Sequence, residues 1–78
     1  ELAPFNIQVN AVSPGFVDTD LTRKILGLKN MKELEEIIPQ GRLANPDEIA
    51  NVVLFLCSSQ NTYITGQNIV VDGGFTSA

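Results

Sequence analysis

Two short segments of strand character lie near opposite ends of this chain, and they constrain its fold more than any other feature. Residues 7–12 are rich in β-branched side chains and end at Ser13-Pro14-Gly15, and residues 67–71 end at Asp72-Gly73-Gly74. The stretch between them has helical character, so we predict that the strands pair in parallel through a long crossover. Ile69-Val70-Val71 is continuously apolar, which is typical of a strand covered on both faces. The pattern therefore predicts the α/β fold class.

The clearest helix signal in the chain begins at Asn45. Asn45 is a preferred N-cap residue, Pro46 occupies the first helical position, and Glu48 follows the cap by three residues, which is a capping-box pattern. Apolar residues then recur through residues 49–56 with helical spacing and form a wide stripe. We therefore predict a largely buried helix over residues 45–59.

Residues 20–38 are predicted to form helices that are interrupted by a glycine. Thr19 or Asp20 can cap a short first helix, and Gly27 stops it. Residues 28–38 have helical composition and an amphipathic pattern, but a helix of this length is marginal alone. We therefore expect this pair of helices to depend on packing against other parts of the protein.

The predicted elements do not add up to an independent domain. One good helix cannot cover both faces of a sheet, and two parallel strands have too few hydrogen bonds to stand alone. The chain has 78 residues, at the low end of what a single core can stabilise. It opens on Glu1-Leu2-Ala3-Pro4, so we expect residues 1–5 to be the end of a helix and residues 1–78 to be one segment of a longer protein.

The composition argues against several classes of function. Five basic residues against nine acidic ones, with a net charge of −4, cannot form the basic patch that nucleic acids require. With no histidine and one cysteine, the chain has no ordinary zinc site and no intramolecular disulfide, so we expect a reducing, cytoplasmic compartment. No apolar run reaches the ~20 residues of a membrane span. Cys57 lies in an apolar run and is expected to be a small buried side chain.

Several blocks of this sequence, taken in order and spacing, resemble one protein family. The first block contains Asn10, Pro14-Gly15, Val17 and Thr19 at the spacing N-x-x-x-P-G-x-[IV]-x-T. The other blocks are Gly41-Arg42-Leu43-Ala44-Asn45-Pro46-Asp47-Glu48-Ile49-Ala50, Tyr63-Ile64-Thr65-Gly66-Gln67 and Val71-Asp72-Gly73-Gly74. The chain resembles the C-terminal part of short-chain dehydrogenase/reductases, most closely the β-ketoacyl-carrier-protein reductase type. The resemblance implies the last two strands, the lid helices and the final helix of a Rossmann-type doubly wound parallel sheet.

The loop after the first predicted strand is the candidate cofactor site. A parallel strand that ends in Pro14-Gly15 places the following residues at the carboxyl edge of the sheet, where α/β folds bind ligands. Pro14 restricts φ, Gly15 permits close approach of a ligand, and Val17 offers its backbone N–H and C=O. Thr19 adds a hydroxyl. The resemblance implies that Val17 contacts the carboxamide of NAD or NADP through its backbone, and that Thr19 binds the carboxamide or the pyrophosphate.

Each of these features also has a simpler structural reading. Pro14-Gly15 could be only a turn, and Thr19 could be a helix cap with or without a role in binding. Arg42 could bind a carboxylate of a ligand, although a structural ion pair is favoured. Residues 20–38 resemble the mobile substrate lid of the family, but ordinary helix packing explains their apolar side chains equally well. The side chains concerned are those of Phe16, Leu21, Ile25, Leu26 and Met31.

The resemblance implies hydride transfer between C4 of nicotinamide and the carbon of a small carbonyl or alcohol substrate, with a tyrosine that passes the proton. The catalytic Ser, Tyr and Lys of the family and its glycine-rich phosphate loop are absent from residues 1–78, and the resemblance places them before residue 1. Tyr63 does not fit the family motif Tyr-x-x-x-Lys, because Gln67 stands where the lysine belongs. No catalytic or metal-binding residue is therefore assigned within the chain.

The resemblance also implies subunit contacts. In the family the last helix and the last strand lie at subunit interfaces, so we expect a homo-oligomer, either a tetramer or a dimer, that uses residues 45–59 and 67–71. The alternative function is a non-catalytic oligomerisation segment of the same fold.

Overall fold

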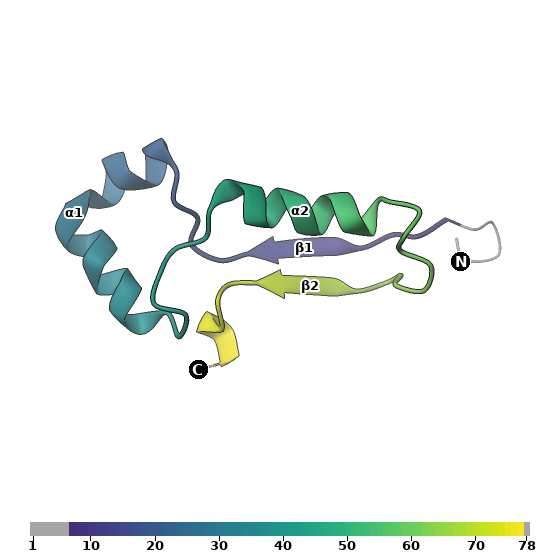
Figure 1. The fold of residues 1–78 in the computed structure, drawn as a ribbon. Helices are drawn as coiled ribbons and strands as arrows, with labels where there is room; N and C mark the ends of the chain where they lie inside the picture. Colours follow the sequence, from purple (N-terminus) through teal and green to yellow (C-terminus); the bar gives the residue numbers. More distant parts are fainter. Residues whose placement is uncertain (1–6, 78) are drawn as a thin grey trace.

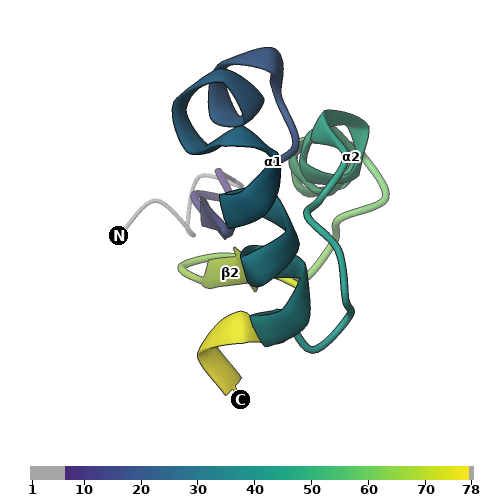
Figure 2. The ribbon, with the colours of Figure 1, turned by 90° about the vertical axis from the view of Figure 1, so that its left-hand side faces the viewer.

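Residues 7–77 fold into two parallel strands, two long helical segments and a short terminal helix (Figure 1). The computed structural model describes residues 7–77, so the helix end predicted over residues 1–5 lies outside the described residues. The elements in order are β1 (Ala11–Pro14), α1 (Asp20–Ile37), α2 (Pro46–Leu56), β2 (Asn68–Val71) and the 3-10 helix η2 (Phe75–Ser77). α1 lies beyond the carboxyl ends of both strands, as Figure 2 shows from that end.

The two strands pair in parallel, which confirms the topology predicted from their separation. The register runs from Ala11 opposite Asn68 to Pro14 opposite Val71. The first strand lies later than the predicted range 7–12, because side chains occupy part of the pairing edge before Ala11. The amide group of Asn10 accepts from the Gln67 N–H at 3.0 Å and donates to the Ile64 carbonyl at 3.0 Å.

Pro14 can belong to β1 although it has no N–H to donate. The N–H groups that reach across to the second strand segment alternate along residues 11–15: Ala11 donates to the Gln67 carbonyl, just before β2, and Gly15, just after β1, donates to the Val71 carbonyl. Pro14 is out of phase with this alternation, so its nitrogen faces away from β2 and no ladder bond is lost.

α1 consists of two helical pieces joined at Gly27. Gly27 has φ 75° and ψ 166°, a backbone conformation that glycine adopts without steric cost. The predicted interruption therefore occurs at the predicted residue. The second piece packs its apolar side against the segment that follows it, and Met31, Ile38 and Leu43 form the buried cluster of the described chain.

α2 has the predicted start and an earlier end than predicted. The capping box is present: the Asn45 side chain accepts from the Asp47 N–H at 2.9 Å, and the Glu48 carboxylate accepts from the Asn45 N–H at 2.8 Å. The helix ends at Leu56 rather than at residue 59. The side chain of Asn61, which is buried, donates to the Leu56 carbonyl at 3.0 Å and so replaces the next helical hydrogen bond.

α2 is less buried than its wide apolar stripe predicts. It runs along β1 (Figure 1), and within α2 only Leu56 is classed as buried. Val53 and Phe55 are each 42% exposed. Cys57 is exposed as well, contrary to the prediction that it is buried. The reason is geometric, since among the described elements α2 packs mainly against β1.

The described residues do not form a compact core. None of their side chains is less than 2% exposed, and the radius of gyration is 15.3 Å. A compact chain of this length would have a radius of about 11.5 Å. Within residues 7–77, no helix combines the length and the apolar character needed to cross a bilayer.

Candidate functional site

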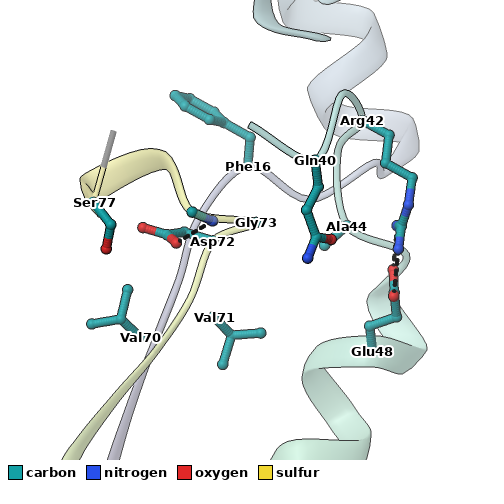
Figure 3. A pocket seen from close by; sticks show the side chains of 11 residues that line it. Phe16, Gln40, Arg42, Ala44, Glu48, Val70, Val71, Asp72, Gly73 and Ser77 are labelled. Atoms are coloured by element: carbon teal, nitrogen blue, oxygen red, sulfur yellow. Dashed lines mark hydrogen bonds and ion pairs between the residues drawn. The ribbon is translucent and has the colours of Figure 1, made fainter. Parts of the chain in front are cut away.

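The carboxyl ends of β1 and β2 bring together three segments that are far apart in the sequence. These segments are the loop 15–19 after β1, the connector 39–45 before α2, and the turn 72–77 after β2 (Figure 1). A cavity of about 530 Å³ opens between them, with Arg42 and Glu48 on one side and Asp72 and Ser77 on the other (Figure 3). This is the edge at which open α/β sheets bind ligands.

Pro14 and Gly15 lie where the two strands end, and the packing of the strand ends supplies a reason for a glycine there. The Gly15 N–H donates to the Val71 carbonyl at 3.0 Å. A β-carbon on Gly15 would lie 2.6 Å from Cβ of Asp72 and 2.9 Å from its Cα. The close approach at Gly15 is therefore to the neighbouring strand end of the same chain. Both residues also line a smaller cavity of about 360 Å³ beside Phe75.

Asp72 organises the turn after β2, a role that the sequence pattern did not reveal. One carboxylate oxygen accepts from the Gly74 N–H at 3.0 Å, and the other accepts from the Thr76 N–H at 2.9 Å and from the Thr76 hydroxyl at 2.7 Å. These hydrogen bonds, led by that of the Thr76 hydroxyl, lower the pKa of Asp72. An aspartate followed by Gly73-Gly74 and then Thr76 was the available signal for this turn.

Val17 forms an isolated parallel bridge with Ala44 of the connector. The Ala44 N–H donates to the Phe16 carbonyl at 2.9 Å, and the Asp18 N–H donates to the Ala44 carbonyl at 2.8 Å. Because peptide groups alternate in direction along an extended chain, the N–H and C=O of Val17 itself point away from the connector. No backbone hydrogen bond among residues 7–77 uses either group. Val17 therefore presents one donor and one acceptor on the outer side of the loop.

Thr19 is the N-cap of α1. Its hydroxyl oxygen accepts from the Thr22 N–H at 3.1 Å and lies 2.9 Å from the Thr22 hydroxyl oxygen. The capping reading of Thr19 is therefore confirmed, and Asp20 is instead the first residue of the helix. A hydroxyl has one hydrogen and two lone pairs, so capping leaves further hydrogen-bonding capacity on the same oxygen.

An ion pair holds the loop against the first turn of α1. The Arg23 guanidinium donates to both carboxylate oxygens of Asp18, at 2.6 and 2.8 Å. The hydrogen bond from Arg23 is the main cause that lowers the pKa of Asp18. Asp18 is thus attached at two points, to α1 through its carboxylate and to Ala44 through its N–H.

A second ion pair, between Arg42 and Glu48, confirms the favoured reading of Arg42. The guanidinium donates to both oxygens of the Glu48 carboxylate, at 2.6 and 2.9 Å (Figure 3). The hydrogen bonds from Arg42 and from the Asn45 N–H lower the pKa of Glu48 to about 2. Since Glu48 occupies the guanidinium fork, Arg42 has a partner from its own chain and is no longer the obvious site for a ligand carboxylate.

The structure divides the apolar side chains that were considered for a substrate wall. Met31 is buried, and Leu26 packs against it in the cluster with Ile38 and Leu43, so these two serve packing. Leu21 is 66% exposed and Ile25 is 72% exposed on the first piece of α1. Phe16 lies at the cavity and meets Phe75 edge to face, with the ring centroids 5.3 Å apart. Leu21 and Ile25 are therefore the members that remain free to contact another molecule.

The four predicted cofactor residues do not line one cavity. Pro14 and Gly15 lie at the strand ends, while Val17 and Thr19 follow on the outer side of the loop. Within residues 7–77, no group of three or more His, Cys, Asp or Glu side chains could hold a metal ion. What the loop offers is a backbone donor and acceptor at Val17, with a hydroxyl two residues later. That set matches a carboxamide, which carries one acceptor oxygen and two donor hydrogens.

Comparison with known proteins identifies the family. A family model described as enoyl-(acyl carrier protein) reductase matches residues 1–76. A 3-oxoacyl-[acyl-carrier-protein] reductase of Aquifex aeolicus is 54% identical over 74 residues, which are 95% of this chain and 29% of that protein. The chain belongs to the short-chain dehydrogenase/reductase family.

Other members of the short-chain dehydrogenase/reductase family match the same span. An NAD-dependent glycerol dehydrogenase of Listeria innocua is 42% identical over 97% of this chain and 30% of that protein. A crystal structure of a short chain dehydrogenase family protein from Francisella tularensis superposes with a TM-score of 0.88 and 40% identity, over 99% of this chain and 36% of that one. The chain thus spans about 30% of the length of the curated relatives named here.

Proposed function

We propose that this chain is the C-terminal segment of an NAD(P)-dependent short-chain dehydrogenase/reductase, which we name the parent reductase. The parent reductase transfers hydride between nicotinamide and the carbon of a small carbonyl or alcohol substrate, and this chain supplies the loop on the nicotinamide side. One observation carries the proposal: the N–H and C=O of Val17 point outward at the carboxyl edge of the sheet. Family membership supports the reaction class.

Four residues of the loop have separate roles in this proposal. Pro14 ends β1 opposite Val71, the last residue of β2. Gly15 lets the loop leave the strand beside Asp72 without a clash. Val17 binds the carboxamide through its backbone pair, which orients the nicotinamide ring. Thr19 adds a hydrogen bond to the carboxamide or to the pyrophosphate while it caps α1.

The cofactor is NAD or NADP, and it supplies the hydride chemistry when bound. The residues named here contact the nicotinamide half, which NAD and NADP share, so they do not select between the two. The relatives include an NAD-dependent dehydrogenase, and we extend only the nicotinamide class to this chain. The proton-transfer residues lie elsewhere in the parent reductase, and Tyr63, which is 98% exposed, is not one of them.

The first piece of α1 is proposed to be part of a substrate lid. Leu21 and Ile25 are exposed apolar side chains that directly follow the cofactor loop. Gly27 occupies an open position, where a β-carbon would have no other atom within 4 Å, and it joins this piece to the packed second piece. A lid of this kind would remove water from the reacting carbon when the substrate binds.

A role in oligomerisation is the second candidate function, and one observation favours it. Val53 on α2 is 42% exposed and Val70 on β2 is 50% exposed, so both elements keep apolar surface to cover. Subunit contacts through α2 and β2 would bury that surface. The two functions are compatible, because the proposed cofactor contacts are made by residues 14–19 and not by Val53 or Val70.

The test of the enzymatic function is carbonyl-dependent oxidation of NADH or NADPH by the parent reductase. Thr19→Ala is expected to raise the KM for the nicotinamide cofactor, while Thr62→Ala, at an exposed turn outside the site, serves as the matched control. A parent protein that oxidises neither cofactor would refute the proposed function. An active parent in which Thr19→Ala behaves like Thr62→Ala would refute only the role of Thr19.

A further inference from the structure

The connector 39–45 sets the position of the proposed nicotinamide loop from one side. Ala44 is its point of contact, through the two hydrogen bonds to Phe16 and Asp18 on either side of Val17. If Ala44 shifts, the peptide planes that carry the Val17 N–H and C=O must turn with it. Hydrogen bonds weaken steeply with misalignment, so the orientation of these two groups depends on where the connector holds Ala44.

The connector has little regular structure to hold that position. Between the end of α1 and the start of α2, Ala44 takes part in an isolated bridge rather than in a strand. Leu43 is buried and anchors the connector in the apolar cluster, but apolar contacts are not directional. Directional restraint therefore has to come from polar groups.

The Arg42–Glu48 ion pair supplies this directional restraint on both sides of Ala44. Before Ala44, the Arg42 guanidinium donates to Glu48 in a bidentate pair and to the Leu43 carbonyl at 3.3 Å. After Ala44, the same Glu48 carboxylate accepts from the Asn45 N–H at 2.8 Å. Glu48 lies in the first turn of α2, where Figure 3 shows it paired with Arg42. Both neighbours of Ala44 are therefore attached to a rigid element.

We propose that Arg42 and Glu48 are positioning residues that orient the Val17 backbone toward the nicotinamide carboxamide by clamping Ala44. This inference rests on the proposed function, and it assigns no contact between either side chain and the cofactor. The path runs from the ion pair to Leu43 and Asn45, then to Ala44, and through the bridge to Val17.

The clamp can be separated from the helix cap, because Arg42 belongs to the clamp and not to the cap. The Asn45 side chain still accepts from the Asp47 N–H when Arg42 is replaced, so α2 keeps its cap in an Arg42 variant. Arg42→Gln therefore removes the Arg42 side of the clamp and leaves the cap intact. Glu48→Gln weakens the clamp but keeps an oxygen that can accept from the Asn45 N–H.

The kinetic experiment compares Arg42→Gln and Glu48→Gln in the parent reductase, with Asn51→Ala at an exposed position of α2 as the control. The two variants change the net charge in opposite directions. General electrostatic attraction to an anionic cofactor would then move the KM for NADH or NADPH in opposite directions. The clamp predicts that both variants raise this KM, on the order of 10-fold, because misplacement of about 1 Å is costly to binding and catalysis.

Arg42→Lys adds a milder variant that keeps the charge but loses the bidentate fork, and it is expected to fall between the wild type and Arg42→Gln. The proposal would be overturned if the KM shifts in opposite directions in Arg42→Gln and Glu48→Gln. It would also be overturned if both variants have the same KM as Asn51→Ala. A reduction in kcat with an unchanged KM would also overturn it.

Hydrogen exchange separates failure of the clamp from failure of the proposed function. In the parent reductase without cofactor, Arg42→Gln is expected to speed exchange at the Ala44 and Asp18 amides, measured by mass spectrometry on peptides covering residues 42–45 and 16–19. Peptides from the middle of α2 should be unchanged. If exchange at the Ala44 and Asp18 amides is unchanged in Arg42→Gln, the clamp is refuted, even in a protein that has reductase activity. If exchange is faster but the protein has no reductase activity, only the link between the clamp and nicotinamide is refuted.

Discussion

Gly15 and Asp72 lie so close together that a β-carbon on Gly15 would come within 2.6 Å of Cβ of Asp72. The contact joins the ends of the two parallel strands, since Gly15 donates to the carbonyl of Val71 at 3.0 Å. Asp72 then holds the following turn through its carboxylate. A single residue without a side chain thus allows β1, β2 and the terminal turn to meet.

Replacing Gly15 by alanine is therefore expected to destabilise the parent reductase by about 1–3 kcal/mol, the usual cost of forcing extra atoms into a packed site. The β-carbon would meet main-chain and Cβ atoms of Asp72, which cannot rotate away. Chemical denaturation of the wild type and the variant measures the difference. Equal unfolding midpoints would show that the strand ends can separate freely, contrary to this prediction.

Substitutions at Thr19 should separate its capping role from its proposed cofactor role. Thr19→Ala removes the acceptor for the Thr22 N–H and should cost about 1 kcal/mol of stability. Thr19→Asn keeps a good cap residue but loses the hydroxyl, so it should restore most of the stability while the KM for NADH or NADPH stays raised. Thr19→Ser should restore both. If Asn restores the KM fully, Thr19 acts only as a cap.

The stability supplied by Glu48 should depend on pH in a defined window. The pKa of Glu48 is about 2 in the folded state, against an ordinary value of 4.5. A depressed carboxyl pKa stabilises the folded state above the unfolded pKa and loses that contribution as the pH falls from about 4.5 toward 2. The difference in unfolding midpoint between wild type and Glu48→Gln should therefore be present at pH 7 and shrink over that range.

The difference in unfolding midpoint between wild type and Glu48→Gln should also decrease at high salt, because both side chains of the Arg42–Glu48 ion pair are exposed. If the unfolding midpoints of wild type and Glu48→Gln differ by the same amount at pH 7 and at pH 3, the charged Arg42–Glu48 pair is not the source of the difference.

The 78-residue chain alone is not expected to unfold cooperatively. Its described part has a radius of gyration of 15.3 Å and no side chain less than 2% exposed, so it buries too little apolar surface to offset the entropy of ordering. Circular dichroism during heating should show a broad, shallow change with residual helix signal from residues 46–56. A sharp and reversible transition of the monomer would show that these elements form a self-sufficient core.

Charge substitutions should reveal whether α2 and β2 form subunit contacts. Val53→Glu and Val70→Glu each place a carboxylate on an exposed apolar position, and either is expected to reduce the size of an oligomeric parent reductase measured by light scattering. Thr62→Glu, on an exposed turn, is the control. An unchanged oligomer in both valine variants, with normal stability, would exclude these surfaces from the interface.

Several local features were predictable because the residues that determine them are near one another in sequence. The capping box at Asn45 and Glu48, the cap at Thr19 and the interruption at Gly27 each depend on a few consecutive residues. Parallel pairing was also predictable, since strands joined by a long helical crossover run in the same direction. The bounds of β1 were not, because the Asn10 side chain competes for the edge of a strand that is distant in sequence.

By itself, the sequence determined the order and type of the elements, the family, and the loop that follows β1. Tertiary structure alone decided what that loop contacts. It placed Ala44 beside Val17 and Asp72 against Gly15. The physical reason is that a helix cap or a glycine interruption depends on residues within about one helical turn. The contacts of Ala44 and Asp72 depend instead on the path of the whole crossover between the strands, and no short run of residues specifies that path.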